Sequence, residues 1–304
     1  MGGKQRPVIG FAGIGNMGWP MAARLIKAEY HVHVLDSRPE RAADFAKETG
    51  GHRALSMREL GAAADIVITM LPDSAAVGEV LFGAADGGAP SLRSGSVVIE
   101  MSSGVPGQTV AFAERLRGQG IGMIDAPVSG GVKRAVTGEL AIMVGGDAAL
   151  IDRCEPVLRS MGATLMRTGA LGTGQAMKAL NNLVSAGGFL IGIEALIIGK
   201  KFGLDPAIMV DVLNASTGMN NSTQKKFKQF VISRSFDSGF GLDLMVKDLT
   251  IALEMARDEG ANAPFAALCR EMWASAATAL GPGQDHTALA KLSEMLAGAQ
   301  LGRD

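Results

Sequence analysis

Cysteine, aromatic residues and net charge are all scarce in this sequence. The 304 residues include two cysteines and 5% aromatic residues, and the formal net charge is −1. Cys154 and Cys269 are too few for a disulfide framework and stand in no metal-binding spacing, so we expect both to pack in a protein of a reducing compartment. The balanced charge and few aromatic rings exclude a basic, base-stacking surface for nucleic acid.

Long uninterrupted apolar segments are missing as well. The most apolar stretch, residues 183–199, contains Ser185, several glycines and Glu194, whereas a membrane-spanning helix needs about 20 apolar residues. We therefore expect a buried helix there and no membrane partner. The short, glycine-interrupted apolar run near the start of the chain does not resemble a secretory signal, which favours a cytoplasmic location.

Glycine, by contrast, is abundant. The chain has 41 glycines without a Gly-X-Y period, 47% hydrophobic residues and 19% charged residues, a composition that excludes collagen and disorder. At about 100–200 residues per domain, the length predicts two domains.

The first half of the chain alternates short apolar runs with helical patterns. This alternation predicts an α/β domain with a doubly wound, mainly parallel sheet whose strands are buried on both faces. The expected strands are residues 8–12, 31–35, 66–70, 97–100, 123–125, 141–144 and 163–166, and the first two helices are residues 20–30 and 39–49.

The second half has helical patterns only. A long apolar helix is expected over residues 175–202, after a glycine-rich segment that we take as the domain boundary. The prediction is an α/β Rossmann-type domain over residues 1–169 and an all-α domain over residues 170–304. Further helices are expected at residues 206–215, 242–259, 264–280 and 287–297.

A G-x-G-x-x-G motif follows the first expected strand and opens the first expected helix. It comprises Gly13, Ile14, Gly15, Asn16, Met17 and Gly18. Glycines at these positions allow the tight turn, the approach of backbone to a pyrophosphate and close helix–strand packing. The helix N-terminus then binds the phosphates. In this context the motif predicts a Rossmann dinucleotide site.

Asp36 ends the second expected strand, about 20 residues after the motif. A carboxylate there accepts hydrogen bonds from the adenosine ribose and repels a 2′-phosphate, which favours NAD. Ser37 is neutral, but Arg38 is a side chain that can bind the 2′-phosphate of NADP. The prediction is NAD, with NADP as the alternative.

Lys178 stands near the start of the long helix, flanked by Met177, Ala179 and Leu180. Partial burial lowers the pKa of a lysine, so this side chain is a candidate for proton exchange with a substrate hydroxyl. Asn182 lies four residues further on the same helix face. A solvated surface lysine is the alternative interpretation.

Two further segments follow expected strands at the edge where parallel sheets bind ligands. Ser129, Gly130 and Gly131 follow residues 123–125 and are candidates to hold a carboxylate. Ser102 and Ser103 follow residues 97–100 and are candidates to contact nicotinamide or substrate. An ordinary turn is the alternative in both cases.

The four histidines form no recognisable catalytic or metal pattern. His31 and His33 share one face of a strand but have no third ligand nearby, and catalytic metal sites usually need three protein ligands. His52 and His286 show no partner pattern. We therefore predict no metal.

Taken together, these segments resemble the β-hydroxyacid dehydrogenase family, which includes 3-hydroxyisobutyrate dehydrogenase, tartronate semialdehyde reductase and 6-phosphogluconate dehydrogenase. The resemblance covers nearly the whole chain, in order. It rests on residues 10–18 with Pro20-Met21-Ala22, on Thr69-Met70-Leu71-Pro72, on residues 125–131, on residues 172–182, and on Phe240 with residues 245–249.

The resemblance implies hydride transfer between a nicotinamide cofactor and the hydroxyl-bearing carbon of a short β-hydroxyacid, with Lys178 as general acid and base. It implies that Ser129, Gly130, Gly131 and Asn182 hold the substrate carboxylate. It places Phe240 and Asp248 at the substrate pocket, Met70, Leu71 and Pro72 beside the cofactor, and Ser102 and Lys247 near the nicotinamide. It also implies a long interdomain helix and a dimer or tetramer built through the helical domain.

Two departures from the family pattern stand out. Glu100 replaces the usual Asp, and Lys133 and Arg134 follow the glycine pair where many relatives have small or neutral residues. These two cations are candidates to bind a second anionic group, although solvated charges are the default.

The segment 216–221 is a candidate for substrate selectivity, with an Asx turn at Asn220 or Asn221 as the alternative. The choice between hydroxyacids, the direction of reaction and the oligomer size stay open.

Overall fold

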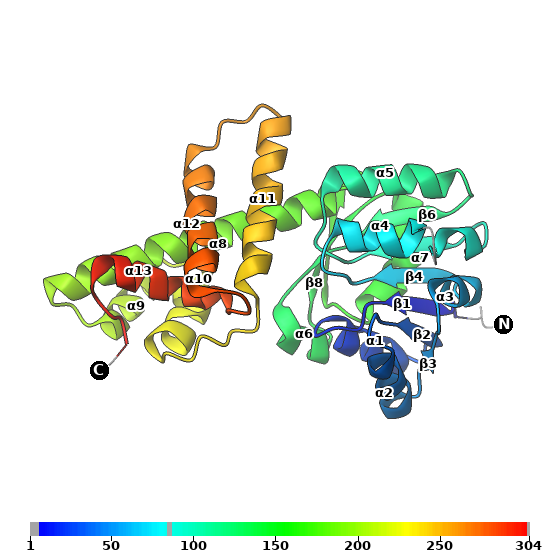
Figure 1. Ribbon diagram of the computed structural model, residues 1–304, viewed down its shortest axis with the longest axis horizontal. Helices are drawn as coiled ribbons and strands as arrows, with labels where there is room; N and C mark the ends of the chain where they lie inside the picture. Colours follow the sequence, from blue (N-terminus) through cyan, green and yellow to red (C-terminus); the bar gives the residue numbers. More distant parts are fainter. Residues whose placement is uncertain (1–5, 84–86, 303–304) are drawn as a thin grey trace. The chain divides into compact units, whose positions relative to one another are not determined.

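The protein consists of two compact units, residues 1–178 and residues 179–304. They are seen in a computed structural model that describes residues 6–83 and 87–302. Helix α8 (Thr173–Phe202) begins in the first unit and continues through the second (Figure 1).

The first unit is built on a nine-stranded sheet. The strands are β1 (Ile9–Ala12), β2 (Val32–Leu35), β3 (His52–Arg53), β4 (Ile66–Thr69), β5 (Val97–Glu100), β6 (Gly122–Asp125), β7 (Val128–Ser129), β8 (Ala141–Gly145) and β9 (Thr164–Gly169). They are ordered β3-β2-β1-β4-β5-β6-β8-β7, with β9 beside β8. Only the pairings of β8 with β6 and β7 are antiparallel among the described strands. The predicted mainly parallel, doubly wound sheet is therefore confirmed, and the order of β1 to β6 is that of the Rossmann fold.

Helices cover both faces of this sheet. They are α1 (Gly18–Lys27), α2 (Pro39–Thr49), α3 (Met57–Ala63), α4 (Ser74–Phe82), the 3₁₀ turn η1 (Ala89–Ser91), α5 (Pro106–Arg117), α6 (Gly131–Thr137) and α7 (Ala148–Arg159). Alternate strand residues enter separate cores, as the two-residue period of a strand requires. Ile66 and Ile68 pack with α1 and α7, whereas Val67 packs with α3 and α4.

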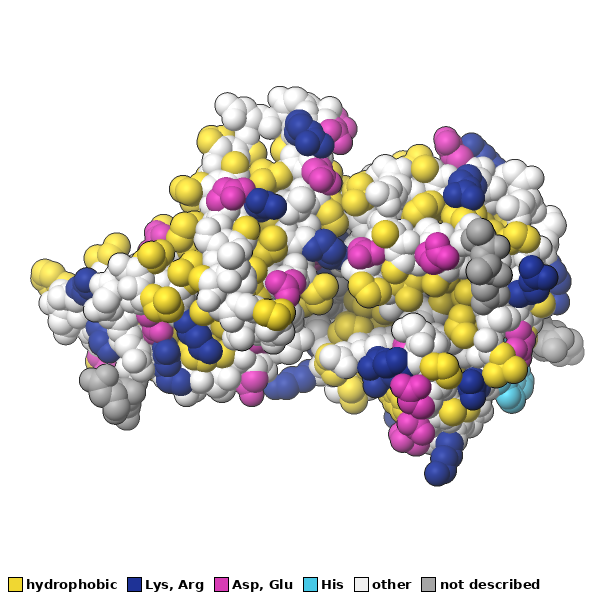
Figure 2. Space-filling model, in the orientation of Figure 1, with side chains coloured by type: hydrophobic (Ala, Val, Ile, Leu, Met, Phe, Trp, Pro, Cys, Tyr) yellow, Lys and Arg dark blue, Asp and Glu magenta, His cyan; other side chains and the backbone are white. Residues whose placement is uncertain are grey.

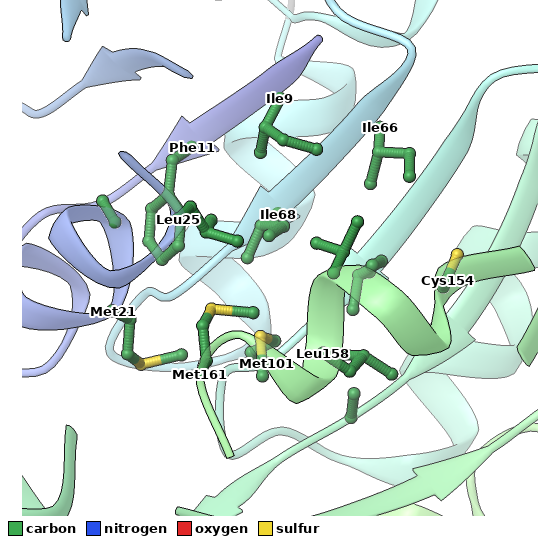
Figure 3. Close-up of a cluster of buried hydrophobic side chains, with 14 of the residues drawn as sticks. Ile9, Phe11, Met21, Leu25, Ile66, Ile68, Met101, Cys154, Leu158 and Met161 are labelled. Atoms are coloured by element: carbon green, nitrogen blue, oxygen red, sulfur yellow. The ribbon is translucent and has the colours of Figure 1, made fainter. Parts of the chain in front are cut away.

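The larger core is shown in Figure 3. Phe11 and Ile68 of the sheet face Leu25 of α1 and Leu158 of α7. Cys154 also lies in this core, and burial raises the pKa of its thiol to about 12. The thiol therefore stays protonated and packs as an apolar group, as expected.

The second unit is helical. It contains the rest of α8, α9 (Pro206–Asn214), α10 (Asn221–Lys225), the π-helical turn η2 (Phe227–Ile232), α11 (Leu242–Asp258), α12 (Pro264–Leu280), the 3₁₀ turn η3 (His286–Ala288) and α13 (Leu289–Ala297). Its core contains Phe189, Phe227 and Trp273, and the Phe189 ring lies 5.3 Å from Phe227 and 5.8 Å from Trp273.

Several boundaries differ from the sequence prediction for local reasons. Helix α1 begins at Gly18, because the glycine turn leads directly into it, and ends at Lys27, before Glu29 takes a positive φ of 63°. Helix α6 was missed. Its Lys133 and Arg134 are exposed on a helix and not on a loop.

Helix α8 is long and apolar enough to cross a membrane by length and composition. However, 56% of its most apolar window is buried inside the protein, as in the core helix of a folded domain. Cationic and anionic side chains are interspersed over the visible face of the molecule, without a basic stripe there (Figure 2).

Candidate active site

The glycine turn between β1 and α1 has the backbone that a dinucleotide site needs. Gly13 has a φ of 90°, and a Cβ there would collide with the carbonyl oxygen of Met70; a Cβ on Gly18 would collide with the carbonyl oxygen of Gly13. Gly15 faces open space, since no atom lies within 4 Å of the place that a Cβ would occupy. No side chain caps the N-terminus of α1. Backbone N–H groups and free space thus fit an incoming pyrophosphate.

Asp36 connects this turn to the end of β2. Its Oδ2 accepts a hydrogen bond from the Ile14 N–H at 3.0 Å, and its Oδ1 accepts one from the Arg38 N–H at 3.0 Å. The Arg38 guanidinium Nε lies 3.4 Å from Oδ1, and the Asp36 side chain is 7% exposed. Ser37 and Arg38 are exposed. A buried carboxylate and an exposed guanidinium therefore lie together at the ribose end of the predicted site.

The segments after β4 and β5 are joined by Ser102. Its Oγ accepts a hydrogen bond from the Leu71 N–H at 3.0 Å, in the Met70-Leu71-Pro72 segment. Gln175, in the first turn of α8, donates from Nε2 to the Ser102 carbonyl at 2.7 Å and accepts from the Gly104 N–H at 2.9 Å. Sequence reasoning missed Gln175, because nothing local marks a bond over 73 residues.

Asp125, the last residue of β6, caps the N-terminus of α8. Its Oδ1 accepts a hydrogen bond from the Gly172 N–H and its Oδ2 accepts one from the Gln175 N–H, each at 2.8 Å. Burial raises the pKa of Asp125, while the backbone donors act in the opposite direction. Gly145 and Gly174 make the contact close, since a Cβ on Gly174 would lie 2.7 Å from Oδ2 and one on Gly145 would lie 2.5 Å from Oδ1.

The Ser129-Gly130-Gly131 segment presents open backbone at Gly131, whereas the Arg134 side chain lies against Gly130. Ser129 lies in β7, half-buried, and pairs with Ala141. Gly130 and Gly131 have φ values of 134° and 68°, which only glycine adopts readily. Nothing lies within 4 Å of a Cβ built on Gly131. The backbone here can approach a small anion.

Lys178 lies in the second turn of α8, just after the segment that Asp125 caps. Its side chain is only 8% exposed, whereas the neighbouring Met177 and Leu180 are each 41% exposed. Lys178 therefore occupies the buried side of the helix, and Asn182, four residues further, is 7% exposed on the same side.

In the second unit, Asp248 joins two of the predicted site residues. Asn182 donates from Nδ2 to Oδ2 of Asp248 at 2.5 Å. The Lys247 ammonium lies 3.3 Å from Oδ1 of Asp248, which is itself only 2% exposed. Phe240 is half-buried just before α11, and its ring packs edge-on against His286 at 5.6 Å.

Hydrogen bonds decide the roles of two polar residues. Asn220 caps α10, since its Oδ1 accepts from the Ser222 and Thr223 N–H groups at 2.8 Å and 3.1 Å, so its side chain serves the Asx-type cap. His286 shows no partner pattern in the sequence, and in the structure its Nε2 lies 2.9 Å from the Lys226 ammonium. The fold brings these residues together over 60 positions of sequence, beyond the reach of local patterns.

Metal binding has no support in the described parts of the chain, where no three His, Cys, Asp or Glu side chains form a cluster suited to an ion. His33 and His52 lie with their rings 5.1 Å apart on neighbouring strands. Burial, followed by the nearby His52, lowers the pKa of His33.

Comparison with known proteins agrees with this geometry. Residues 8–170 match the family model described as the NAD binding domain of 6-phosphogluconate dehydrogenase. Residues 172–293 match the one described as NAD-binding of NADP-dependent 3-hydroxyisobutyrate dehydrogenase. The chain belongs to the β-hydroxyacid dehydrogenase family. It is therefore an NAD(P)-dependent oxidoreductase.

Similarity to individual members extends over almost the full length. The chain is 35% identical to 2-(hydroxymethyl)glutarate dehydrogenase of Eubacterium barkeri, over 96% of this chain and 97% of that protein. It is 36% identical to 3-hydroxyisobutyrate dehydrogenase of Pseudomonas aeruginosa, over 93% and 97%. A solved structure of Mycobacterium tuberculosis 3-hydroxyisobutyrate dehydrogenase with L-serine superposes with a TM-score of 0.87 at 32% identity, over 95% of this chain and 99% of that one.

The Asp125 cap yields a prediction for this dehydrogenase. Asp125→Ala should lower the free energy of unfolding by about 1–2 kcal/mol, the usual cost of losing an N-cap. It should also lower kcat for hydroxyacid oxidation at least about tenfold, because small displacements of a catalytic group are costly. Chemical denaturation and NADH absorbance measure the two effects.

Asp147→Ala is the matched control. Asp147 caps α7 through the Ala149 and Leu150 N–H groups at 3.0 Å and 3.1 Å, so this variant should lose comparable stability while kcat stays within about twofold. Equal losses of kcat in both variants would contradict a specific role for the Asp125 cap.

Proposed function

We propose that this dehydrogenase interconverts a short β-hydroxyacid and its semialdehyde or oxo acid, with Lys178 as the proton-exchanging group. The observation that carries the proposal is the burial of Lys178, which is 8% exposed, in a helix whose N-terminus is hydrogen-bonded to the end of strand β6. A lysine that served only as a solvated surface charge would be exposed.

The proposed chemistry divides between a cofactor and the side chains of this chain. A nicotinamide cofactor, with its pyrophosphate at the Gly13–Gly18 turn, would supply the hydride acceptor in oxidation and the donor in reduction. In oxidation the neutral amine of Lys178 accepts the proton of the substrate hydroxyl. In reduction its ammonium returns that proton to the forming alkoxide.

The remaining site residues are assigned binding and orienting roles. Ser129 and the N–H groups of Gly130 and Gly131 hold the substrate carboxylate, which the open space at Gly131 supports. Asn182 contributes to the same task, and Asp248 fixes the orientation of its amide through the 2.5 Å hydrogen bond. The other proposed members are Phe240 at the substrate pocket, Ser102 and Lys247 near the nicotinamide, and Met70, Leu71 and Pro72 beside the cofactor.

NAD is the proposed cofactor, with NADP as the alternative. Asp36 is buried and already bonded to the turn, so its carboxylate lies at the ribose end and would repel a 2′-phosphate. The pairing of Arg38 with Asp36 offsets the charge that could otherwise attract that phosphate.

3-Hydroxyisobutyrate is the substrate we place first, because the chain is similar to dehydrogenases of that name over nearly its full length. The alternatives are reduction of tartronate semialdehyde, of succinic semialdehyde or of glyoxylate. An imine reductase or a non-catalytic nucleotide-binding protein is a remote alternative, which the buried Lys178 and Asn182 disfavour.

We also propose a cytoplasmic homo-oligomer, a dimer or tetramer, formed through the second unit. One side of α8 carries exposed apolar side chains within about 40° of one another around the helix axis. They are Leu180, Val184, Ile191, Ile198 and Phe202, exposed by 41%, 77%, 54%, 70% and 85%. Exposed apolar stripes of this kind are typical of self-association.

Replacement of the proposed acid and base tests the mechanism. Lys178→Ala should lower kcat for 3-hydroxyisobutyrate by about 10²–10⁴-fold, the usual contribution of general acid–base catalysis. Binding of NADH, followed by fluorescence, should be retained. Lys201→Ala, which removes an exposed lysine from the same helix, is the control, and near-normal turnover by Lys178→Ala would rule out the assigned role.

A panel of hydroxyacids assayed separately with NAD and NADP tests substrate and cofactor together. We expect kcat/KM with NAD to exceed that with NADP by at least about tenfold, because Asp36 disfavours the added phosphate. Asp36→Ala should lower this ratio of kcat/KM with NAD to kcat/KM with NADP. Preference for NADP in the unmodified enzyme would contradict the cofactor assignment, and turnover of cyclic imines without any hydroxyacid would contradict the reaction.

A further inference from the structure

The second unit contains a lysine held by a buried histidine. The Lys226 ammonium lies 2.9 Å from Nε2 of His286 and 3.5 Å from Oγ of Ser185, on α8. His286 is only 3% exposed. Its ring is stacked on Trp273, at 6.3 Å and 15°, and packs against Phe189 at 6.0 Å. The aromatic packing fixes the ring, and the ring fixes the ammonium.

Hydrogen bonds on the other side of the ring assign its proton. Nδ1 of His286 lies 3.0 Å from Oγ of Ser238 and 3.2 Å from the carbonyl oxygen of Phe240. The Ser238 hydroxyl proton is directed to Asp285, whose carboxylate oxygens lie 2.9 Å and 3.0 Å away. Both neighbours of Nδ1 are therefore acceptors, so Nδ1 carries the proton.

Nε2 consequently presents its lone pair to Lys226 and accepts an ammonium N–H. Burial, and then the positive charge of Lys226, lowers the pKa of His286 to about 4, so the ring is neutral at physiological pH. A neutral imidazole that accepts this hydrogen bond orients the ammonium and adds no charge of its own beside it. The arrangement keeps a cation at a fixed place beside a hydroxyl group.

The hydroxyl group in question lies on the catalytic side of α8. Ser185 follows Lys178 by seven residues, which places the two about 20° apart around the helix axis and about 10.5 Å apart along it. Asn182 lies between them, about 4.5 Å from Ser185 along the axis. Lys178, Asn182 and Ser185 therefore form one row on the helix. Lys226 contacts Ser185, at the end of the row away from Lys178.

We propose that Lys226, together with Ser185, binds a second carboxylate at the distal end of the substrate. This inference rests on the proposed function and extends its substrate class to β-hydroxyacids that carry an additional anionic group. A four- or five-carbon chain extends about 5–6 Å, and a hydrogen bond at each end adds about 3 Å, which matches the spacing along the row. An ammonium is a compact point charge suited to an anion.

Lys133 and Arg134 are the residues that the sequence suggests for binding a second anionic group. Both are exposed on α6, and the Arg134 side chain lies against Gly130. Lys226 differs from them in being half-buried and held in place by His286. A positioned cation of this kind loses less side-chain entropy when it binds a ligand than an exposed one does.

Two substrates that differ only at the distal end test this subsite. 3-Hydroxyisobutyrate carries a methyl group where 2-(hydroxymethyl)glutarate carries a carboxyethyl group. In Lys226→Met, we expect the ratio of the KM for 2-(hydroxymethyl)glutarate to the KM for 3-hydroxyisobutyrate to rise at least about tenfold, with kcat for 3-hydroxyisobutyrate as the internal reference. Lys226→Arg, which retains the charge, should restore part of the preference.

Lys228→Met is the matched control, because Lys228 lies two residues further and pairs with Asp211 at the surface. It should leave the KM ratio unchanged. A ratio that Lys226→Met does not alter, or an equal rise in both KM values, would overturn the proposal. If the unmodified enzyme oxidises neither compound, the result contradicts the proposed function itself, and the subsite proposal falls with it.

Inhibition of the unmodified enzyme gives a second test that needs no variant. Glutarate and butyrate share one carboxylate, and only glutarate has a second. We expect the competitive inhibition constant of glutarate against 3-hydroxyisobutyrate to be at least about tenfold lower than that of butyrate. Equal inhibition constants would contradict a distal carboxylate site.

Discussion

The capping of α8 by Asp125 is the interaction on which the site depends. Asp125 ends a parallel strand at the ligand-binding edge, and its two oxygens each accept a backbone N–H from the start of α8 at 2.8 Å. Because each oxygen binds a different N–H, the cap fixes both the position and the rotation of the helix. Lys178, three residues after Gln175 in the same unit, takes its direction from that rotation, since successive residues turn by about 100°.

Residues of α8 fall into three groups: the exposed stripe is separated from the other two around the helix, and the core residues are separated from the Lys178 row along it. Lys178, Asn182 and Ser185 form a row on one side. The exposed apolar stripe, Leu180, Val184, Ile191, Ile198 and Phe202, lies on the opposite side. Phe189 and Ile193 lie in the core of the second unit. The apolar character that makes this helix resemble a membrane span thus has two separate sources, the core and the exposed stripe.

Local patterns were sufficient for much of the fold. Helices α2 and α12 have the predicted bounds, since proline at the start of each marks where a helix begins. The glycine turn was recognisable because its backbone demands glycine at Gly13 and Gly18 whatever the tertiary context. Helix α6 was missed because Gly130 and Gly131, read as loop residues, precede only a short helical segment.

The supporting contacts of the site were not predictable in the same way. The bonds from Gln175 to Ser102, from Asp125 to Gly172 and from Lys226 to His286 join residues 73, 47 and 60 positions apart. Such contacts depend on how whole helices and strands pack against one another. No local periodicity in a single sequence predicts that packing. The side chains that we propose contact ligands follow family motifs, whereas the side chains that hold them in place follow the three-dimensional fold.

A double-mutant cycle between Asp125 and Lys178 tests most directly whether the cap acts through the lysine. The kcat values of Asp125→Ala, Lys178→Ala and the double variant are compared with that of the unmodified enzyme. If the cap serves to position Lys178, the double variant should be no more than about twofold slower than Lys178→Ala alone. Losses that multiply in the double variant would show that Asp125 and Lys178 contribute independently, and would contradict this account.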